Sequence, residues 1–384
     1  MRILIMTVTA GHGHNSTARA MEEHLSANGA EVTVLDMYKH ISRTLFHMVD
    51  KGYLFSVTRT PRHFGRNYSI VERRKMPREI LGRLNSNRLM AKRLASFFKN
   101  YQPQLIISTH VFASQVLDVL KQHGHLNVPF LGIVTDYCIH PFWETVPTTE
   151  YIVTANEIMR YAAERRGIEA NRLLPLGIPI SAKFSQRTDK REARAALKLD
   201  EHKTTILLMG GSMGYGDMLQ TVADIDAMGQ DYQLVCITGR NERLYKQLKQ
   251  VETRSPLHIC GFTDQVDLYM DAADCIITKP GGLTVTESLA KSLPMILVSP
   301  IPGHEERNAN FLTNAGAAVL VSKHFPIAEA VYTVLGRPGR LELMREAISH
   351  IALPNAAAEI SRFALELCKG NTPEEAACEP AGIC

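Results

Sequence analysis

Residues 278–287 read Thr-Lys-Pro-Gly-Gly-Leu-Thr-Val-Thr-Glu. The apolar run just before them, residues 275–277, predicts a strand that enters a Pro-Gly-Gly turn, and a helix is expected to begin near Thr284. Backbone N–H groups and hydroxyls at a helix start suit a phosphate. One turn into the helix, the Glu287 carboxylate can accept from both hydroxyls of a ribose. The stretch therefore predicts a site for a nucleoside diphosphate where a strand meets a helix.

Strand-like and helix-like segments alternate along the rest of the chain. In the first half, strands are expected at 2–8, 31–35, 105–108, 130–135 and 151–154, with helices at 16–28 and 113–123. A charged helix is expected at 190–199, between the two halves. In the second half, strands are expected at 204–209, 233–238, 257–260, 274–278 and 295–298. This alternation is typical of parallel sheets with helices on both faces. The predicted fold class is α/β, with two Rossmann-like doubly wound domains.

The chain has 384 residues, enough for two such domains. The predicted division is an N-terminal acceptor and membrane domain at 1–180, a linker and helix at 181–203, a C-terminal nucleotide domain at 204–369 and a flexible tail at 370–384. The last helix is a candidate to pack back on the first domain. Ligands of these folds lie at the carboxyl ends of the strands, so the two domains are expected to face a cleft.

Seven cysteines form no Cys-x-x-Cys pair, which favours free thiols in a reducing cytosol and gives no support for a metal site. The N-terminus lacks the pattern of a signal peptide, and no apolar run reaches the length of a membrane span. We therefore expect a soluble, cytoplasmic chain without a metal site.

Positive charge is concentrated in one segment, although the whole chain carries only +4. Residues 39–99 hold fifteen Lys and Arg against three acidic residues, and apolar side chains such as Phe46 and Phe55 lie between the charges. A basic surface with apolar projections suits the anionic face of a membrane. The alternative is an ordinary solvated helix face. Nucleic acid is not expected, because no nucleic-acid-binding motif accompanies the charge.

The first predicted strand runs into a Gly-rich turn, Gly11-His12-Gly13-His14-Asn15-Ser16. This places His14 at a helix start, where a neutral imidazole can act as a general base. One alternative is a capped structural turn with an idle histidine. A second is dinucleotide binding, because Gly11-x-Gly13-x-x-Ser16 is followed about 20 residues later by Asp36, but the third glycine of that fingerprint is missing.

Further candidates for a nucleotide-sugar donor lie at strand ends of the second half. Small residues that admit phosphate oxygens follow the strand at 204–209: Gly210, Gly211, Ser212 and Gly214. Phe262 and Thr263 are candidates for a base, unless Phe262 is a core residue. A polar run suited to sugar hydroxyls contains His304, Glu305 and Asn308, unless it is only a solvated helix start.

Candidates for the acceptor side lie at strand ends of the first half. Asp136, His140 and Trp143 follow one strand, and His110 follows its neighbour. Trp143, the only tryptophan, is equally compatible with a core position, and His110 with a structural role.

Taken together, these motifs resemble the monogalactosyldiacylglycerol synthase and processive diacylglycerol glucosyltransferase family of glycosyltransferase family 28. A more distant likeness is to the enzyme that adds N-acetylglucosamine to lipid I. The motifs that carry the resemblance are Gly13-His14, Thr135-Asp136-Tyr137 with His140 and Trp143, Lys279 to Thr284 with Glu287, and Pro302-Gly303-x-Glu305-Glu306-x-Asn308.

The resemblance implies a GT-B fold and an inverting, metal-independent hexosyltransferase that moves glucose or galactose from a UDP-sugar to diacylglycerol at the cytoplasmic membrane face. The donor contacts that it implies are Phe262 and Thr263 for uracil, Glu287 for ribose, Gly211, Ser212, Leu283 and Thr284 for the phosphates, and His304 with Glu305 for the sugar. Lys279, Gly281 and Gly282 are further candidates for donor binding. No cofactor is expected besides the UDP-sugar substrate. It also implies His14 as general base, with Asp136 in reserve.

Two alternatives stay open: another lipid acceptor, such as a polyprenyl-linked one, and a catalytically silent UDP-sugar-binding regulator. His304 stands where the family usually has glutamine, so the identity of the sugar is open as well. Oligomeric state is not predicted.

Overall fold

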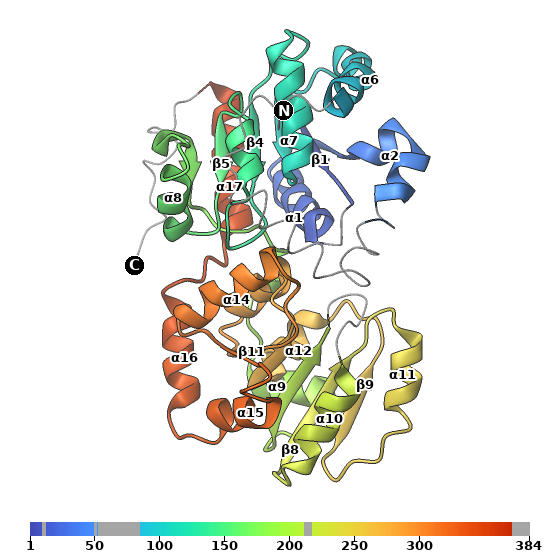
Figure 1. Cartoon of the computed structure of the whole chain (residues 1–384), viewed down its shortest axis with the longest axis vertical. Helices are drawn as coiled ribbons and strands as arrows, with labels where there is room; N and C mark the ends of the chain where they lie inside the picture. Colours follow the sequence, from blue (N-terminus) through green and yellow to red (C-terminus); the bar gives the residue numbers. More distant parts are fainter. Residues whose placement is uncertain (10–12, 50–51, 53–84, 211–216, 371–384) are drawn as a thin grey trace. The chain divides into compact units, whose positions relative to one another are not determined.

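The computed structural model describes residues 1–9, 13–49, 52, 85–210 and 217–370. They form two compact units (Figure 1). Unit 1 contains Met1–Ala182, Pro302–His304 and the chain from Asn355 onward, and unit 2 contains Lys183–Ile301 and Glu305–Pro354. The centre of the basic segment and the predicted tail after Gly370 lie outside the described residues, so what was expected of them stays a prediction.

Unit 1 is built on a sheet of six parallel strands in the order β2-β1-β3-β4-β5-β6. The strands are β1 Arg2–Thr7, β2 Glu31–Asp36, β3 Leu105–Ser108, β4 Phe130–Ile133, β5 Tyr151–Val153 and β6 Leu173–Leu174. In register, Ile3 of β1 pairs with Val32 on one side and with Leu105 on the other. The strand order reverses between β1 and β3, which is the position where open α/β sheets bind ligands.

Helices cover both faces of this sheet. They are α1 Gly13–Ala27, α2 Met37–Ile41, α6 Asn85–Tyr101, α7 Val111–Gln122, α8 Glu157–Glu164 and α17 Ala356–Lys369, with 3₁₀ turns η1 Pro141–Thr145 and η2 Ala170–Arg172. Successive residues of β1 point to opposite faces, so Ile3 and Ile5 pack with α1 and α17, whereas Leu4 and Met6 pack with α6 and α7. The last helix, red in Figure 1, therefore contributes to the core of unit 1.

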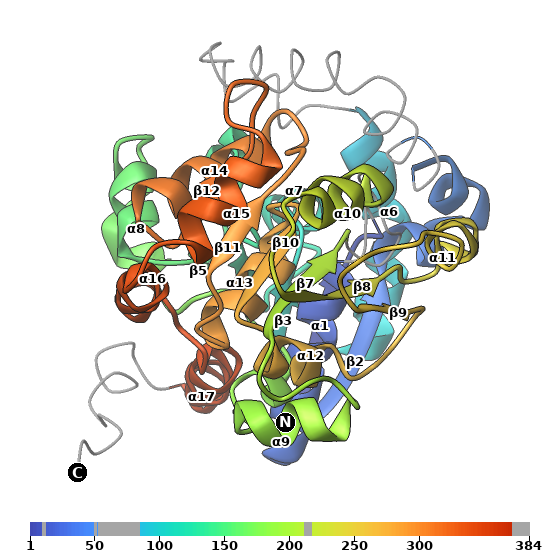
Figure 2. The same cartoon turned by 90° about the horizontal axis from the view of Figure 1, so that it is seen from below.

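Unit 2 repeats the architecture with six parallel strands in the order β12-β11-β10-β7-β8-β9, of which β11 to β9 are visible in that order in Figure 2. The strands are β7 Thr204–Met209, β8 Tyr232–Ile237, β9 Leu257–Cys260, β10 Cys275–Thr278, β11 Met295–Leu297 and β12 Ala318–Leu320. The order reverses between β7 and β10. The predicted α/β class with two parallel sheets is confirmed.

The helices of unit 2 begin with α9, before β7, and the others follow its strands. They are α9 Lys190–Ala196, α10 Met218–Ala227, α11 Glu242–Leu248, α12 Val266–Ala272, α13 Gly282–Ala290, α14 His304–Asn314, α15 Ile327–Leu335 and α16 Arg340–Ser349. The first residue of α14, His304, is grouped with unit 1. Ile206, Leu234 and Ile277, from three neighbouring strands, lie in the main apolar core of the unit.

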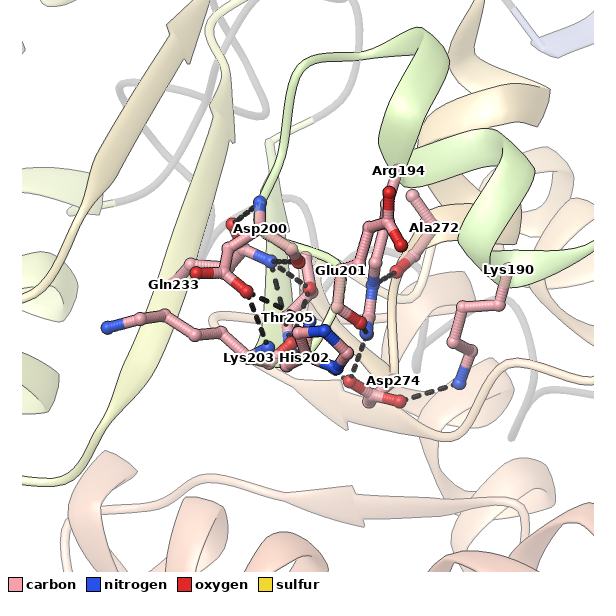
Figure 3. Close-up of polar contacts among 10 residues, drawn as sticks. All are labelled: Lys190, Arg194, Asp200, Glu201, His202, Lys203, Thr205, Gln233, Ala272 and Asp274. Carbon is pink, nitrogen blue, oxygen red and sulfur yellow. Dashed lines mark hydrogen bonds and ion pairs between the residues drawn. The ribbon is translucent and has the colours of Figure 1, made fainter.

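A polar network fixes α9 to the amino end of this sheet (Figure 3). Arg194 of α9 is 5% exposed, and its guanidinium donates to the carbonyls of Ala272 and Glu201 at 3.0 and 2.8 Å and to Asp274 Oδ2 at 2.7 Å. The Asp274 carboxylate also accepts from Lys190 Nζ at 2.6 Å. Each of the three guanidinium nitrogens of Arg194 therefore donates to an acceptor. A buried charge requires such partners.

The same network holds the first residues of neighbouring strands (Figure 3). The backbone N–H of Thr205 in β7 donates to Asp274 Oδ2 at 2.8 Å, just before β10. Gln233 of β8 is fully buried, and its amide donates to the Thr205 hydroxyl at 2.8 Å and to the Asp200 carbonyl at 2.6 Å. Strands anchored at this end present their carboxyl ends, and the loops that follow, in a fixed arrangement.

Candidate functional site

In unit 1, the ends of β1, β3 and β4 converge on the ring of His14, the second residue of α1. His14 Nδ1 lies 2.8 Å from the carbonyl oxygen of Thr109, which follows β3, and 3.2 Å from the hydroxyl of Thr135, which follows β4. A carbonyl only accepts, so Nδ1 carries the proton and donates to it. The lone pair is then on Nε2, the form of imidazole that can take a proton from a substrate.

The surroundings of His14 favour the neutral ring. Burial lowers its pKa, and this effect exceeds the opposing effects of the Asp136 carboxylate and of the bond to Thr109, both of which raise it. His14 is therefore neutral near pH 7, with its one ring proton on Nδ1. Asp136, predicted as the reserve base, acts on the His14 ring through its charge.

The carboxylate of Asp36 is engaged by the chain itself. Its Oδ2 accepts from the backbone N–H and the hydroxyl of Thr9 at 2.9 and 2.6 Å, and its Oδ1 accepts from Lys39 N at 2.9 Å, which caps α2. These bonds hold the turn after β1. They occupy three of the roughly four acceptor sites of the carboxylate, so few remain for a dinucleotide ribose, which disfavours the dinucleotide alternative. Gly11 lies outside the described residues, and Gly13 opens α1.

His110 and His140 both occupy helix N-caps. His110 Nδ1 accepts from the backbone N–H of Phe112 at 3.0 Å, and His140 Nδ1 accepts from that of Phe142 at 3.1 Å. The His110 ring meets the His14 ring edge-on, with centroids 4.3 Å apart. Burial, and then the neighbouring His14 and His140, hold the pKa of His110 well below its ordinary value. His110 is thus a neutral ring beside the candidate base.

Trp143 is a buried residue. It is 4% exposed, and its ring packs against Gly132 of β4 so closely that an added Cβ there would lie 2.3 Å from Trp143 Cζ3. This burial agrees with the core alternative, and a contact of Trp143 with the acceptor stays a prediction.

In unit 2, the turn predicted for phosphate joins β10 to α13. The helix begins at Gly282, two residues earlier than expected, so Leu283 and Thr284 lie in its first turn. Its N-cap, Gly281, supplies no side-chain hydrogen bond, and the first turn has no acidic residue. The leading N–H groups of a helix have no acceptor within the helix and carry its positive dipole end, so this helix start suits an anion.

The turn between β10 and α13 is fixed by a contact between β10 and β7, the two strands between which the strand order of unit 2 reverses. The Thr278 hydroxyl donates to the Met209 carbonyl at 2.7 Å, which ties the end of β10 to the end of β7. Gly210 follows β7 directly, whereas Gly211, Ser212 and Gly214 lie outside the described residues. Lys279 follows Thr278 directly, at the carboxyl end of β10. The phosphate contacts assigned to the glycine-rich loop stay a prediction.

Two residues of α14, Asn308 and Glu305, lie against the turn between β10 and α13. Asn308 is fully buried, and its Nδ2 donates to the Pro280 carbonyl at 2.9 Å. Glu305 is 7% exposed; its Oε2 accepts from Ile301 N at 2.7 Å, and an added Cβ on Gly281 would lie 3.8 Å from its Oε1. The alternative of a solvated helix start is therefore wrong for these two residues. Both support the turn, and a direct sugar contact of Asn308, Glu305 or His304 stays a prediction.

Glu287 lies one turn into α13 and is partly buried. Loss of water around its carboxyl raises its pKa to about 8; the cation of Lys183 opposes this shift and the charge of Asp267 adds to it. Lys183 Nζ lies 3.0 Å from Asp267 Oδ1 and also donates to the Asp264 carbonyl. Lys183 belongs to the 3₁₀ turn η3 Ala182–Phe184, and sequence reasoning missed it, because a lone lysine in a linker carries no local signal.

Phe262, predicted to contact a base, is a surface ring. It is 63% exposed, and the guanidinium carbon of Arg240 lies 5.2 Å from its ring centroid. The core alternative for Phe262 is therefore wrong. Arg240 was not predicted, although it follows β8 much as Phe262 follows β9. Next to the ring, the Thr263 hydroxyl accepts from Gln265 N at 3.1 Å.

The described residues contain neither a cluster of metal ligands nor a helix suited to cross a membrane. Among residues 1–9, 13–49, 52, 85–210 and 217–370, no three His, Cys, Asp or Glu side chains are grouped as a metal site would need. Within the same ranges, no helix has both the length and the apolar character that crossing a bilayer would take. That the reaction needs no metal ion stays a prediction.

Both units match known domain families. Residues 14–180 match the family described as monogalactosyldiacylglycerol (MGDG) synthase, and residues 205–349 match the glycosyltransferase family 28 C-terminal domain. A Bacillus licheniformis protein named processive diacylglycerol beta-glucosyltransferase is 29% identical over 360 residues, covering 92% of each chain. The Bacillus subtilis protein of the same name is 27% identical over 361 residues, 93% of this chain and 92% of that one.

Solved structures show the same fold at low identity. MurG of Acinetobacter baumannii has a TM-score of 0.63 and 14% identity, covering 95% of this chain and 99% of that one. The spinosyn rhamnosyltransferase SpnG has a TM-score of 0.62 and 14% identity over 94% of this chain and all of its own. The predicted GT-B fold is confirmed. The chain thus carries an MGDG synthase domain followed by a glycosyltransferase family 28 C-terminal domain.

Proposed function

We propose that the protein is an inverting hexosyltransferase that moves glucose or galactose from a UDP-sugar to diacylglycerol at the cytoplasmic membrane face. The observation that carries the proposal is that both matched domains contain a set of residues fit for their share of the reaction. The range 14–180 includes His14 and its hydrogen-bond partners, and the range 205–349 includes the start of α13 and Glu287. Relatives named for diacylglycerol glucosyl transfer align over nine tenths of the chain.

Unit 2 binds the donor in this proposal. The pyrophosphate lies at the N-terminus of α13, where backbone N–H groups offset its charge. Glu287 accepts from the ribose hydroxyls, and the exposed ring of Phe262 packs on uracil. As the bond to the sugar breaks, the same N–H groups stabilise the charge that develops on the departing UDP, the role that a metal ion has in other transferases.

Unit 1 supplies the base. The acceptor hydroxyl donates to Nε2 of His14, and its oxygen attacks the anomeric carbon from the side opposite UDP. The new bond joins this oxygen to the sugar, the bond from the anomeric carbon to the β-phosphate oxygen breaks with its electron pair, and the hydroxyl proton goes to Nε2. The Thr109 carbonyl then accepts from an imidazolium that Asp136 also stabilises, so the positive charge is partly offset.

The outer face of α6 supports the membrane part of the proposal. Arg88, Lys92, Arg93 and Lys99 are exposed on it, together with Leu89, which is 57% exposed. The opposite face, with Leu94 and Phe98, is buried in the core of unit 1. Basic side chains around an exposed leucine suit an anionic lipid surface.

The proposed reaction is tested by offering the protein UDP-glucose, UDP-galactose and UDP-N-acetylglucosamine in turn, with vesicles containing either diacylglycerol or a polyprenyl phosphate-linked acceptor. Mass spectrometry of the lipid fraction should show one hexose added to diacylglycerol, with release of UDP. Product formed only on the polyprenyl lipid would replace the acceptor, and UDP binding without any lipid product would support the silent regulator instead.

A further inference from the structure

The same tripeptide pattern, His-x-Phe, follows two neighbouring strands of unit 1. His110-Val111-Phe112 comes after β3, and His140-Pro141-Phe142 comes after β4, the next strand of the sheet. In each case the histidine is the N-cap of the helical turn that follows, α7 or η1, and the phenylalanine is its second residue. Because β3 and β4 are paired in parallel, their carboxyl ends lie side by side, and both helical turns begin there.

Each cap fixes the phenylalanine beside its own histidine. Nδ1 of His110 accepts from Phe112 N and Nδ1 of His140 from Phe142 N, at 3.0 and 3.1 Å. The ring centroids are 4.9 Å apart in the first pair and 4.4 Å apart in the second. A side-chain cap therefore sets the orientation of both the imidazole and the backbone that carries the phenyl ring.

The two pairs join into one row of rings that reaches the candidate base. Phe112 and Phe142 are in contact, with centroids 5.7 Å apart, and His110 lies 4.3 Å from His14. Phe112 is 36% exposed and Phe142 is partly exposed, so the phenyl end of the row is open to solvent. Two adjacent, partly exposed phenyl rings have no role in the core clusters of unit 1 among the described residues.

We propose that Phe112 and Phe142 form a ledge that binds the first methylenes of the acceptor's acyl chains while the glycerol hydroxyl reaches His14. This inference rests on the proposed function and adds to it the residues that recognise the apolar part of the acceptor. A molecule whose hydroxyl contacts Nε2 of His14 has its remaining atoms within a few ångströms of that ring, which is where the row begins. The neutral state of His110 keeps a charge away from the chains.

The row of rings favours one long-chain acceptor over a general membrane contact. A membrane anchor needs only exposed apolar side chains, as Leu89 on α6 provides. Phe112 and Phe142 are instead linked to the base through His110 by a continuous series of ring contacts. Their position suits a group that is covalently attached to the reacting hydroxyl.

The test compares Phe112→Ala and Phe142→Ala with Tyr161→Ala, a control in α8 of the same unit whose side chain is 63% exposed. Transfer is measured in mixed micelles with diacylglycerols of increasing chain length. Each phenylalanine variant should raise KM for a long-chain acceptor about tenfold, since part of a ring's apolar contact is lost, with kcat and UDP affinity unchanged. Tyr161→Ala should behave as the parent protein. Phe112→Leu, which keeps an apolar side chain, should recover most of the affinity.

The ledge also predicts a loss of chain-length dependence. In the parent protein, KM should fall as the acyl chains lengthen from two carbons to about six or eight, and this fall should flatten in both alanine variants. Unchanged KM and chain-length dependence in both variants, with the parent active, would overturn the ledge and leave the proposed function standing. Loss of binding to vesicles without diacylglycerol, with KM for short-chain acceptors unaltered, would overturn it in favour of a membrane contact. A parent protein that transfers sugar to no diacylglycerol refutes the proposed function itself.

Discussion

The raised pKa of Glu287 predicts that UDP binding depends on pH. The partly buried carboxyl has a pKa of about 8, so it is mostly protonated in the free protein at pH 7. The ionised form offers each of the two ribose hydroxyls its own charged acceptor oxygen, whereas the protonated form is neutral and carries an O–H on one oxygen, which makes it the weaker acceptor. Binding in the proposed mode therefore requires the carboxyl to lose its proton, and affinity should rise with pH up to about the pKa of this group.

The size of the effect follows from the shifted pKa. With a pKa of about 8, roughly one Glu287 carboxyl in eleven is ionised at pH 7 and about ten in eleven at pH 9. The Kd for UDP should therefore be about tenfold lower at pH 9 than at pH 7, and binding at pH 7 should release close to one proton. Removing the cation with Lys183→Met should raise the pKa of Glu287 further and move the same transition to higher pH.

Isothermal titration calorimetry in buffers of different ionisation enthalpy measures both the affinity and the proton release. Glu287→Gln is the matched control, since its amide has the same size and does not titrate; it reports the ionisation of UDP and of all other groups. The difference between the parent and this variant isolates Glu287. Equal pH dependence in the two proteins, or no proton release by the parent at pH 7, would refute the placing of the ribose on an ionised Glu287.

Four further substitutions have expected outcomes. His14→Ala should lower kcat about 10²–10⁴-fold, the usual contribution of a general base, while calorimetry finds the same Kd for UDP; unchanged turnover would remove His14 from the mechanism. Arg194→Ala leaves the Asp274 carboxylate without its buried partner and should lower the free energy of unfolding by about 3–5 kcal/mol in urea titrations, whereas Lys190→Ala, which removes a more exposed partner, should cost less than about 1 kcal/mol. Equal effects of these two changes would contradict the network. Gly132→Ala would place a methyl group 2.3 Å from an indole carbon and should cost about 1–3 kcal/mol in the same assay; an unaltered midpoint would show that the indole moves freely.

The sequence predicts most strands of both sheets because a parallel sheet is buried on both faces. Leu105–Ser108 is a short, mainly apolar run that is buried throughout, and its predicted bounds agree with the structure. The bounds predicted for Leu257–Cys260, a partly buried edge strand, agree as well. The strands β6 and β12 are not predicted, because two or three residues at a sheet edge form no recognisable run. Their pairing depends on the neighbouring strand rather than on their own sequence.

The sequence also predicts which strand ends carry the site, but not what each side chain does there. Glycine and proline mark the turn before α13, and the motif places His14 at a helix start. The capping roles of His110 and His140 depend on the backbone of the next two residues, although the repeated His-x-Phe pattern was a signal that pointed to them. The approach of Lys183 to the site of Glu287 arises only from tertiary packing and has no local pattern.

The configuration of the product gives the most direct test of sugar transfer by a hydroxyl that His14 activates. UDP-glucose or UDP-galactose, whose sugar is joined to UDP through an α bond, is incubated with the protein and diacylglycerol vesicles, and the anomeric proton of the glycolipid is observed by NMR. Attack from the side opposite UDP predicts a β-linked sugar and one UDP released for each glycolipid formed. An α-linked product, or free sugar released without any glycolipid, would contradict the mechanism.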